Sequence, residues 1–148
     1  MHLTIHFTLE ELDGATSPPD VRVNLAALAT LLEDCRALWG DRPVVVSSGY
    51  RSPNQNANAA GSKGSQHLTG EAADLHVAGL DAVEAWKLLL ASDVQVGQAI
   101  VYGLDTYGGG PGTFLHVSLP DVGRGLCNQF LWTPAAGGSH GPYHRIER

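Results

Sequence analysis

The chain has 148 residues, of which 43% are hydrophobic and 16% are charged, and its formal net charge is −6. This size and composition are typical of one globular domain and exclude a disordered chain. The acidic balance offers no basic face to nucleic acid, and no stretch is long and apolar enough to span a membrane. We therefore expect a single domain over residues 1–148 that binds neither nucleic acid nor membrane.

The amino-terminal residues predict helices that act as scaffold. In residues 6–12, Thr8 is placed to cap a short helical turn, with Glu11 as the other half of a capping box. A longer helix is predicted from Pro18 to about Trp39, because apolar residues recur there at three- and four-residue spacing. Gly40 is expected to end it, since glycine readily takes a positive φ.

The two cysteines, Cys35 and Cys127, form no CxxC pair, so a thiolate zinc site is not expected. Cys35 falls on the apolar face of the predicted long helix and is expected to be a small core residue. A disulfide between the two cysteines is the alternative.

The middle of the chain predicts strands alternating with short helices. Residues 43–48 contain three consecutive valines and predict a buried strand. Ser52 and Pro53 predict the cap and first residue of a short helix that runs through Ala60. An amphipathic helix is predicted over residues 81–91.

Three further strands are predicted over residues 72–77, 98–102 and 114–119, whereas residues 120–148 are mixed and glycine-rich and predict no element. Together these elements indicate an α+β fold, with a small central, mostly antiparallel sheet and helices packed on one side of it.

Residues 47–77 hold the side chains with the clearest chemistry. His67 and Asp74 stand seven positions apart, with Gly70 between them at a position that suits a tight bend. His116 stands on a later predicted strand. Two imidazoles and one carboxylate are the three protein ligands that a catalytic zinc takes when it keeps one position open for water.

Each of these three residues also has a plainer interpretation. A single histidine on an apolar strand is usually a satisfied core residue, and a single aspartate is usually a cap or a buried acceptor. The combination favours a metal, because Asp74 stands in an otherwise apolar strand, where an unpaired carboxylate is costly. A shared cation would remove that cost for Asp74 and for His116 together.

Three segments resemble the zinc D-alanyl-D-alanine carboxypeptidase family, which includes phage endolysin endopeptidases and is related to hedgehog and lysostaphin-type metallopeptidases. The segments are SGYRSPNQN at 48–56, SQHLTGEAAD at 65–74 and HVS at 116–118. The FTLEEL opening and the order of strands are similar to the short phage-type branch. The resemblance covers about Phe7 to Leu119, leaves 120–148 as a carboxy-terminal extension, and implies a small α+β domain with a central antiparallel sheet.

The resemblance implies zinc as the cofactor and His67, Asp74 and His116 as its ligands. It implies that Arg51 binds the carboxylate of a peptide substrate or polarises its carbonyl, for which the planar guanidinium fork is suited. A structural salt bridge is the alternative for Arg51. Ser65 is implied to lie beside the site as a substrate-binding residue.

The chain departs from the family at the general base. Larger members carry a Glu or Asp three residues before the final histidine, where this chain has Thr113. Some short relatives have an acid at the end of the preceding strand, where this chain has Tyr102. Neither titrates near neutral pH. Asp105 is the nearest acid and is the expected catalytic residue, and His76 is an alternative base or orienting residue, or a packed histidine.

The implied activity is zinc-dependent hydrolysis of peptide bonds in peptidoglycan stem peptides, by a carboxypeptidase or an endopeptidase. The alternative is a zinc-containing cell-wall-binding or phage-assembly module with weak or no catalysis. His140 and His144 are expected to be a solvated pair in the tail, with a lid or an extra ligand as the alternative.

The expected partner is a stem peptide, and the chain is expected to act as a monomer. The amino-terminal residues show no basic region followed by an apolar one, so we expect no secretory signal. Synthesis in the cytoplasm is then expected, with action on the cell wall after phage-type release or another export route.

Overall fold

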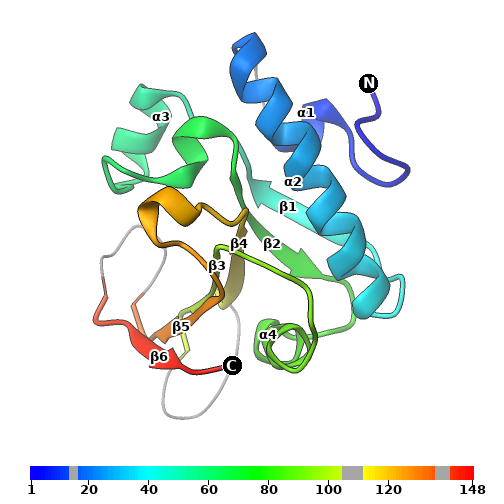
Figure 1. Ribbon diagram of the computed structural model, residues 1–148, viewed down its shortest axis with the longest axis vertical. Coiled ribbons are helices and arrows are strands. Elements are labelled where there is room, and N and C mark those ends of the chain that lie inside the picture. The colour runs from blue at the N-terminus through cyan, green and yellow to red at the C-terminus, as the bar shows by residue number, and fades with distance from the viewer. Residues whose placement is uncertain (14–16, 105–111, 136–140) are drawn as a thin grey trace.

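The computed structural model describes residues 1–13, 17–104, 112–135 and 141–148, and its centre is a six-stranded sheet in the order β1-β2-β4-β3-β5-β6 (Figure 1). Neighbouring strands are antiparallel except β3 and β5, which are parallel. The predicted α+β class with a mostly antiparallel sheet is confirmed. The strands are β1 (Val44–Ser48), β2 (Ala72–Val77), β3 (Gln98–Tyr102), β4 (Phe114–Ser118), β5 (Gln129–Thr133) and β6 (His144–Ile146).

Among the described residues, the four α-helices lie where the sequence predicts them, although α3 ends at Asn58 and not at Ala60, and the two short 3₁₀ helices were not predicted. Thr8 and Glu11 form the predicted capping box, and Ser52 forms a second one with Gln55. Gly40 ends the long helix with a φ of 79°. The helices are α1 (Leu9–Asp13), α2 (Pro19–Leu38), α3 (Pro53–Asn58), η1 (Gln66–Thr69), α4 (Ala82–Leu90) and η2 (Val122–Arg124).

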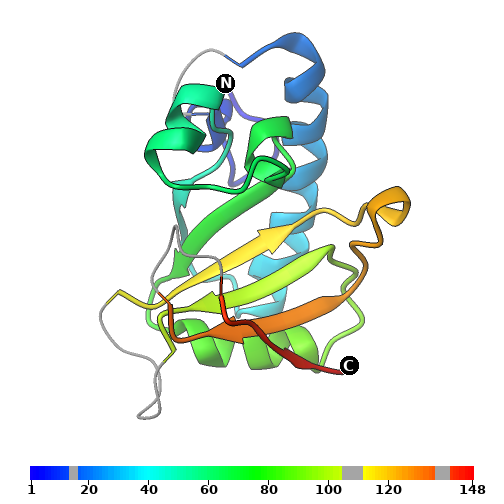
Figure 2. The ribbon, with the colours of Figure 1, turned by 90° about the vertical axis from the view of Figure 1, so that its left-hand side faces the viewer.

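The two faces of the sheet have different neighbours, because side chains along a strand alternate between faces. One face is apolar and packs against α2 and α4, which lie on the same side of the sheet (Figures 1 and 2). Two indole N–H groups link these helices to their neighbours: Trp39 donates to the carbonyl of Ala85, and Trp86 donates to the carbonyl of Ala99. The buried residues on this face of the sheet are Ala73, Leu75, Val77, Ala99, Val101, Leu115, Val117 and Phe130.

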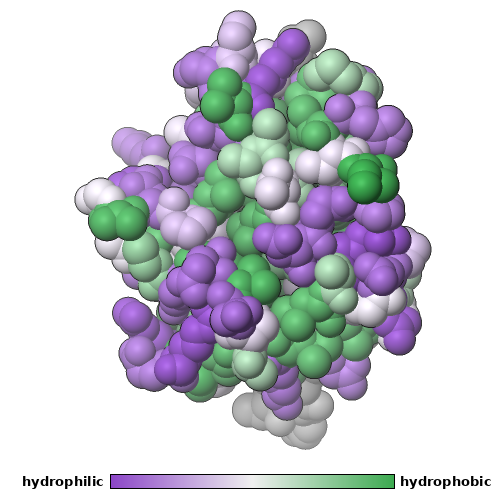
Figure 3. Space-filling model, turned by 45° about the vertical axis from the view of Figure 1, so that its right-hand side comes forward, coloured by the Kyte–Doolittle hydropathy of each residue, from purple (hydrophilic) through white to green (hydrophobic). Residues whose placement is uncertain are grey.

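The core also contains Cys35, as predicted, and burial raises the pKa of its thiol to about 12. Cys127 is exposed, and both thiols are free, so the disulfide alternative is wrong. Among the described residues, no helix is both long enough and apolar enough to cross a bilayer. On the face that Figure 3 shows, hydrophilic and hydrophobic residues are interspersed.

The predicted burial of β1 is wrong. β1 is an edge strand and not a buried one: it pairs only with β2, and Val45 is 57% exposed. The three valines indicate a high β propensity, and this propensity does not distinguish an edge strand from a central one.

The residues after 119 contain two strands that their sequence does not predict. β5 pairs in parallel with β3, and β6 pairs with β5. The end of the chain is held by Arg148, which donates hydrogen bonds to the carbonyls of Ser92 and Val94 and lies over the ring of Phe130. These strands are short and form through contacts distant in sequence, so local pattern gives little sign of them.

Candidate metal centre

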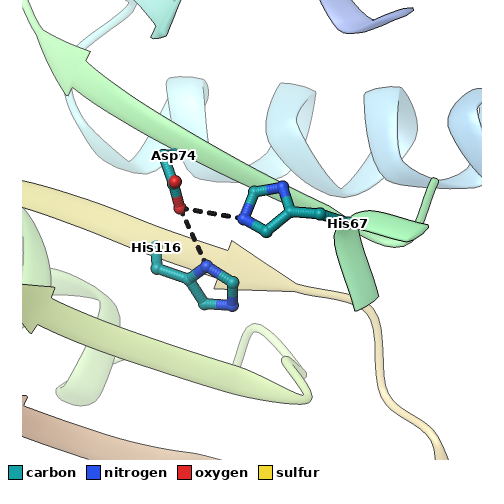
Figure 4. Close-up of side chains that lie close together, drawn as sticks. All are labelled: His67, Asp74 and His116. Carbon is teal, nitrogen blue, oxygen red and sulfur yellow. Dashed lines mark hydrogen bonds and ion pairs between the residues drawn. The ribbon is translucent and has the colours of Figure 1, made fainter. Parts of the chain in front are cut away.

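Three side chains from separate elements converge on the face of the sheet opposite α2 and α4 (Figure 4). His67 comes from η1, Asp74 from β2 and His116 from β4. Asp74 and His116 are direct cross-strand partners in the sheet. The Nε2 atom of His67 lies 3.2 Å from Oδ1 of Asp74, and Nδ1 of His116 lies 2.8 Å from the same oxygen. All three residues are buried.

The backbone around η1 fixes the ring of His67. Ser65 caps this helix by accepting a hydrogen bond from the backbone N–H of His67. Gly70 ends it in the left-handed region, with a φ of 75°. The Nδ1 atom of His67 lies 2.7 Å from the carbonyl oxygen of Gly49. A carbonyl only accepts, so Nδ1 carries the proton and the ring presents Nε2 to Asp74.

Gly49 reaches this position through a close backbone approach. A Cβ atom on Gly49 would lie 2.0 Å from the carbonyl oxygen of Leu12, and the neighbouring N–H of Tyr50 donates to that oxygen at 2.7 Å. Glycine is therefore required sterically at the residue whose carbonyl orients His67. A hydrogen bond of this kind to the second ring nitrogen is typical of histidines that bind metals.

The arrangement of His67 and Asp74 favours a proton or a metal ion between their facing atoms. With Nδ1 donating to Gly49, the Nε2 of His67 faces the carboxylate of Asp74, and an Nε2 without a proton directs its lone pair at that oxygen. Two lone pairs facing each other at 3.2 Å repel unless a proton or a metal ion lies between them. His116 directs a second nitrogen at the same carboxylate oxygen.

The pKa values of the cluster reflect burial and mutual contact. Burial alone would raise the pKa of Asp74, but hydrogen bonds and charge interactions with His116 and His67 outweigh it and hold the pKa well below its ordinary value. Burial lowers the pKa of His116, and contact with Asp74 offsets that only in part. An ionised carboxylate beside a neutral imidazole is the protonation state in which both bind a metal.

The donor set fits zinc. One nitrogen or oxygen from each of the three residues lies within 4.8 Å of the others. Ligand atoms around a tetrahedral zinc are about 3.3 Å apart, given zinc–ligand distances near 2 Å. The separation of 3.2 Å between His67 and Asp74 matches this value, and that of 2.8 Å between Asp74 and His116 is somewhat shorter. Imidazole and carboxylate ligands suit zinc, and three protein ligands leave one position open.

Arg51 lies against the same carboxylate. Its Nη2 donates to Oδ2 of Asp74 at 3.0 Å, and its Nε donates to Oγ of Ser48 at 3.0 Å. The side chain is 18% exposed and also lines the cavity described next. The salt bridge expected as the alternative is therefore present, and the same guanidinium is within reach of a ligand in the cavity.

A cavity of about 520 Å³ opens beside the three residues. Its floor is the face of the sheet opposite α2 and α4, which carries Gln98, Ile100 and Tyr102 from β3, and Phe114 and His116 from β4. The loop from α3 to η1 borders it, and residues after 119 also contribute: Arg124, Leu126, Leu131 and Tyr143. The volume is of the size that accommodates a short peptide.

Not every predicted residue lies at the site. Asp105 and His140 fall outside the described residues. His76 is exposed and is not among the described residues that line the cavity, so neither a role as base nor a packed position is supported. His144 stacks on Trp132 with a ring-centroid distance of 4.1 Å. Ser65 does border the cavity, where its hydroxyl oxygen caps η1.

Tyr143, Arg124 and Gln66 are among the polar side chains of the cavity that the sequence did not identify. Tyr143 lies with its hydroxyl 3.0 Å from that of Tyr102. Arg124 donates to the carbonyl of Gly64 across the cavity rim. Gln66 donates to the carbonyl of Leu119 at 2.9 Å, while its buried Oε1 has no hydrogen-bond partner within the described part of the chain. Gln66 could have been identified from the sequence because it adjoins His67. No sequence pattern points to Tyr143 or Arg124 as cavity residues.

Comparison with known proteins agrees with this geometry. A family model described as peptidase M15 matches residues 5–105, which is more than half of the chain. The zinc D-Ala-D-Ala carboxypeptidase of Streptomyces albus G is 34% identical over 79 residues. That alignment covers 48% of this chain and 31% of the relative, so the chain spans less than a third of the relative's length. His116 lies beyond the family match, and the fold supplies it.

Proposed function

This chain belongs to the peptidase M15 family, and on that premise we propose that it is a zinc-dependent hydrolase of peptide bonds in peptidoglycan stem peptides. The observation that carries the proposal is the convergence of His67, Asp74 and His116 at one side of an open cavity. The carboxypeptidase of Streptomyces albus G supports the substrate class. The proposed place of action is the cell wall.

Each residue of the site has a separate role in the proposed reaction. Zinc bound by His67, Asp74 and His116 would polarise a carbonyl and bring the pKa of a bound water near neutrality. Gly49 holds His67 in the tautomer that presents Nε2. Arg51 keeps Oδ2 of Asp74 occupied, which leaves Oδ1 to face the two imidazoles. We propose that the guanidinium also binds an oxygen of the peptide.

One observation favours a second candidate function. Among the described residues that line the cavity, Asp74 is the only carboxylate, and it faces both imidazoles and Arg51. Thr113 is buried, and burial together with Tyr143 raises the pKa of Tyr102 above its ordinary value. Neither replaces a carboxylate as a base. A zinc-containing module that binds stem peptides without cleaving them is therefore the alternative.

Release of soluble stem-peptide fragments from purified peptidoglycan separates the two candidates. The zinc-loaded chain is expected to release fragments, and a chelator is expected to stop the release, which added zinc restores. His116→Ala should be inactive, whereas His76→Ala, which removes an exposed imidazole from β2, should behave as the native chain. Zinc binding and peptide binding without fragment release would contradict the hydrolase and support the binding module.

A further inference from the structure

Two tyrosine hydroxyls form a pair at the edge of the cavity. The oxygen atoms of Tyr102 and Tyr143 are 3.0 Å apart, and both residues line the cavity together with Asp74 and His116. Tyr102 is the last residue of β3, and Tyr143 directly precedes β6. The pair therefore joins the part of the chain that matches the family model to a residue well beyond it.

The ring of Tyr102 is fixed on both sides. It stacks on Phe114, its cross-strand partner, with a centroid distance of 5.0 Å and an interplanar angle of 12°. It meets the ring of His116 edge to face at 6.3 Å, and that of Tyr143 at 6.1 Å. These contacts hold the hydroxyl on the cavity face of the sheet, next to one of the three metal-binding side chains.

Either hydroxyl can donate within the pair, and one of the two arrangements leaves the proton of Tyr102 directed at the cavity. When Tyr143 donates to the oxygen of Tyr102, the proton of Tyr102 is available to the cavity, and its donor strength increases because linked hydrogen bonds polarise one another. The Tyr102 hydroxyl is neutral at pH 7, since burial and the contact with Tyr143 raise its pKa above the ordinary value near 10. A neutral donor suits an uncharged or negatively charged oxygen, and peptides offer such oxygens as carbonyls and carboxylates.

We propose that Tyr102, positioned by Tyr143, donates a hydrogen bond to an oxygen of the peptide bound in the cavity. This inference rests on the proposed function for the identity of the ligand as a peptide. It assigns a part of substrate recognition to the residues after 119, because Tyr143 comes from that segment. Tyr143 acts through Tyr102 and is a positioning residue.

The test compares Tyr102→Phe, Tyr143→Phe and the double variant, each of which removes only hydroxyl oxygens. Tyr50→Phe is the matched control, because its ring packs against the core and is not among the described residues lining the cavity. Two quantities are measured: kcat/KM for fragment release from peptidoglycan by the zinc-loaded chain, and the Kd of the metal-free chain for the tripeptide L-Lys-D-Ala-D-Ala. Zinc content and Tm are recorded for every variant.

Loss of the Tyr102 donor is expected to lower kcat/KM by about 100- to 1,000-fold, as for removal of one donor to an oxygen that gains charge during the reaction. It is expected to weaken tripeptide binding by about 5- to 10-fold, the size of one neutral hydrogen bond. Tyr143→Phe should have a smaller effect of the same kind. The double variant should equal Tyr102→Phe, because Tyr143 has nothing to position once the Tyr102 hydroxyl is absent.

Additive losses in the double variant would overturn the positioning role of Tyr143. Unchanged kcat/KM and Kd in Tyr102→Phe would overturn the proposal, as would losses that Tyr50→Phe reproduces. A fall in Tm without a change in Kd would also overturn it, since the pair would then only hold the tail. If the native chain releases no fragments, the proposed hydrolysis fails, and the tripeptide Kd alone then tests whether Tyr102 binds the peptide. If the native chain does not bind the tripeptide, the inference is overturned.

Discussion

The cavity has two walls built on different principles. The metal wall consists of Arg51, His67, Asp74 and His116, and each of these side chains is fixed by hydrogen bonds to the others or to the backbone. The carboxy-terminal wall consists of the cavity-lining residues after 119, which are Arg124, Leu126, Leu131 and Tyr143. Its side chains are mostly exposed or half-buried, and two of the four are apolar.

The difference indicates that metal binding and peptide recognition depend on different parts of this fold. A metal site needs ligands held within a few tenths of an ångström, so its wall is buried and densely bonded. A peptide-binding wall needs shape and a few donors, and it tolerates exposure. Substitutions in the metal wall should therefore reduce zinc binding or catalysis strongly, whereas those in the carboxy-terminal wall should change affinity by modest factors.

The largest effect is expected from Asp74→Asn. The substitution keeps the shape but removes the charge that faces both imidazoles and Arg51. Zinc affinity should fall by at least about 100-fold, the upper end for loss of a group that only orients a ligand, because a ligand carboxylate is lost and the half-buried Arg51 loses its ion-pair partner. Competition with a chromogenic chelator measures the affinity. Asp34→Asn, on an exposed position of α2, is the control, and equal affinities would contradict the assignment of Asp74.

Gly49→Ala should weaken metal binding although Gly49 is not itself a residue of the metal wall. The new Cβ would meet the backbone of Leu12 at 2.0 Å and displace the carbonyl that orients His67. Loss of such an orienting hydrogen bond typically weakens metal binding by about 10- to 100-fold.

The control for Gly49→Ala is Gly123→Ala. At Gly123, a Cβ would meet only Asp121, at an ordinary 3.6 Å, and the φ is not in the left-handed region. Zinc titration of both variants, each checked for folding by circular dichroism, decides the matter. A folded Gly49→Ala chain with native zinc affinity would show that the Gly49 carbonyl does not orient His67.

Arg51→Lys should separate the two roles of this residue. Lysine retains the positive charge but cannot contact Ser48, Asp74 and a peptide oxygen through one planar fork. We expect zinc content to stay native and kcat/KM for fragment release to fall by about 10-fold or more. Native kcat/KM in the lysine variant would indicate that Arg51 serves only as a salt-bridge partner of Asp74.

The smallest effect concerns the pH dependence of stability in the metal-free chain. Burial lowers the pKa of His116 below its unfolded value, so the unfolded chain binds this proton first as the pH falls. Stability should therefore decrease as the pH drops below about 6.5, by at most about 1.4 kcal/mol per pH unit, until the native pKa is passed. The depressed pKa of Asp74 adds a second loss that begins only below about pH 4.

Urea unfolding of the metal-free chain between pH 8 and pH 5 measures this slope. His116→Gln has no titrating ring and should flatten the curve below pH 6.5, while His76→Gln should leave it unchanged, since His76 is exposed. A slope that persists in His116→Gln would show that another group carries the dependence.

The two walls also differ in how far the sequence predicts them. His67 and Asp74 stand in one short segment, and His116 stands in a predicted strand, so spacing and chemistry favoured a metal at these three residues. Arg51, the fourth residue of the metal wall, was implied only by the family resemblance. The elements that carry it were predicted for the same reason: caps, turns and alternation are local signals. The hydrogen bond from His67 to Gly49 joins residues 18 positions apart, and no local pattern reports it.

The carboxy-terminal wall escaped prediction because nothing local specifies it. β5 becomes a strand through parallel pairing with β3, about thirty residues earlier in the chain, and Tyr143 reaches the cavity through the pairing of β6 with β5. The buried position predicted for β1 was wrong for the same reason, since only the sheet order shows that β1 is an edge. Asp105, the predicted catalytic acid, stays a prediction.

The most direct test of the account is the zinc content of the purified native chain beside His116→Ala and His76→Ala. We expect about one zinc per chain in the native protein and in His76→Ala, and none retained by His116→Ala. Stem-peptide fragments should be released only by the two chains that hold zinc. A native chain that takes up no zinc when it is supplied, or a His116→Ala chain that binds it as the native chain does, would contradict the central claim.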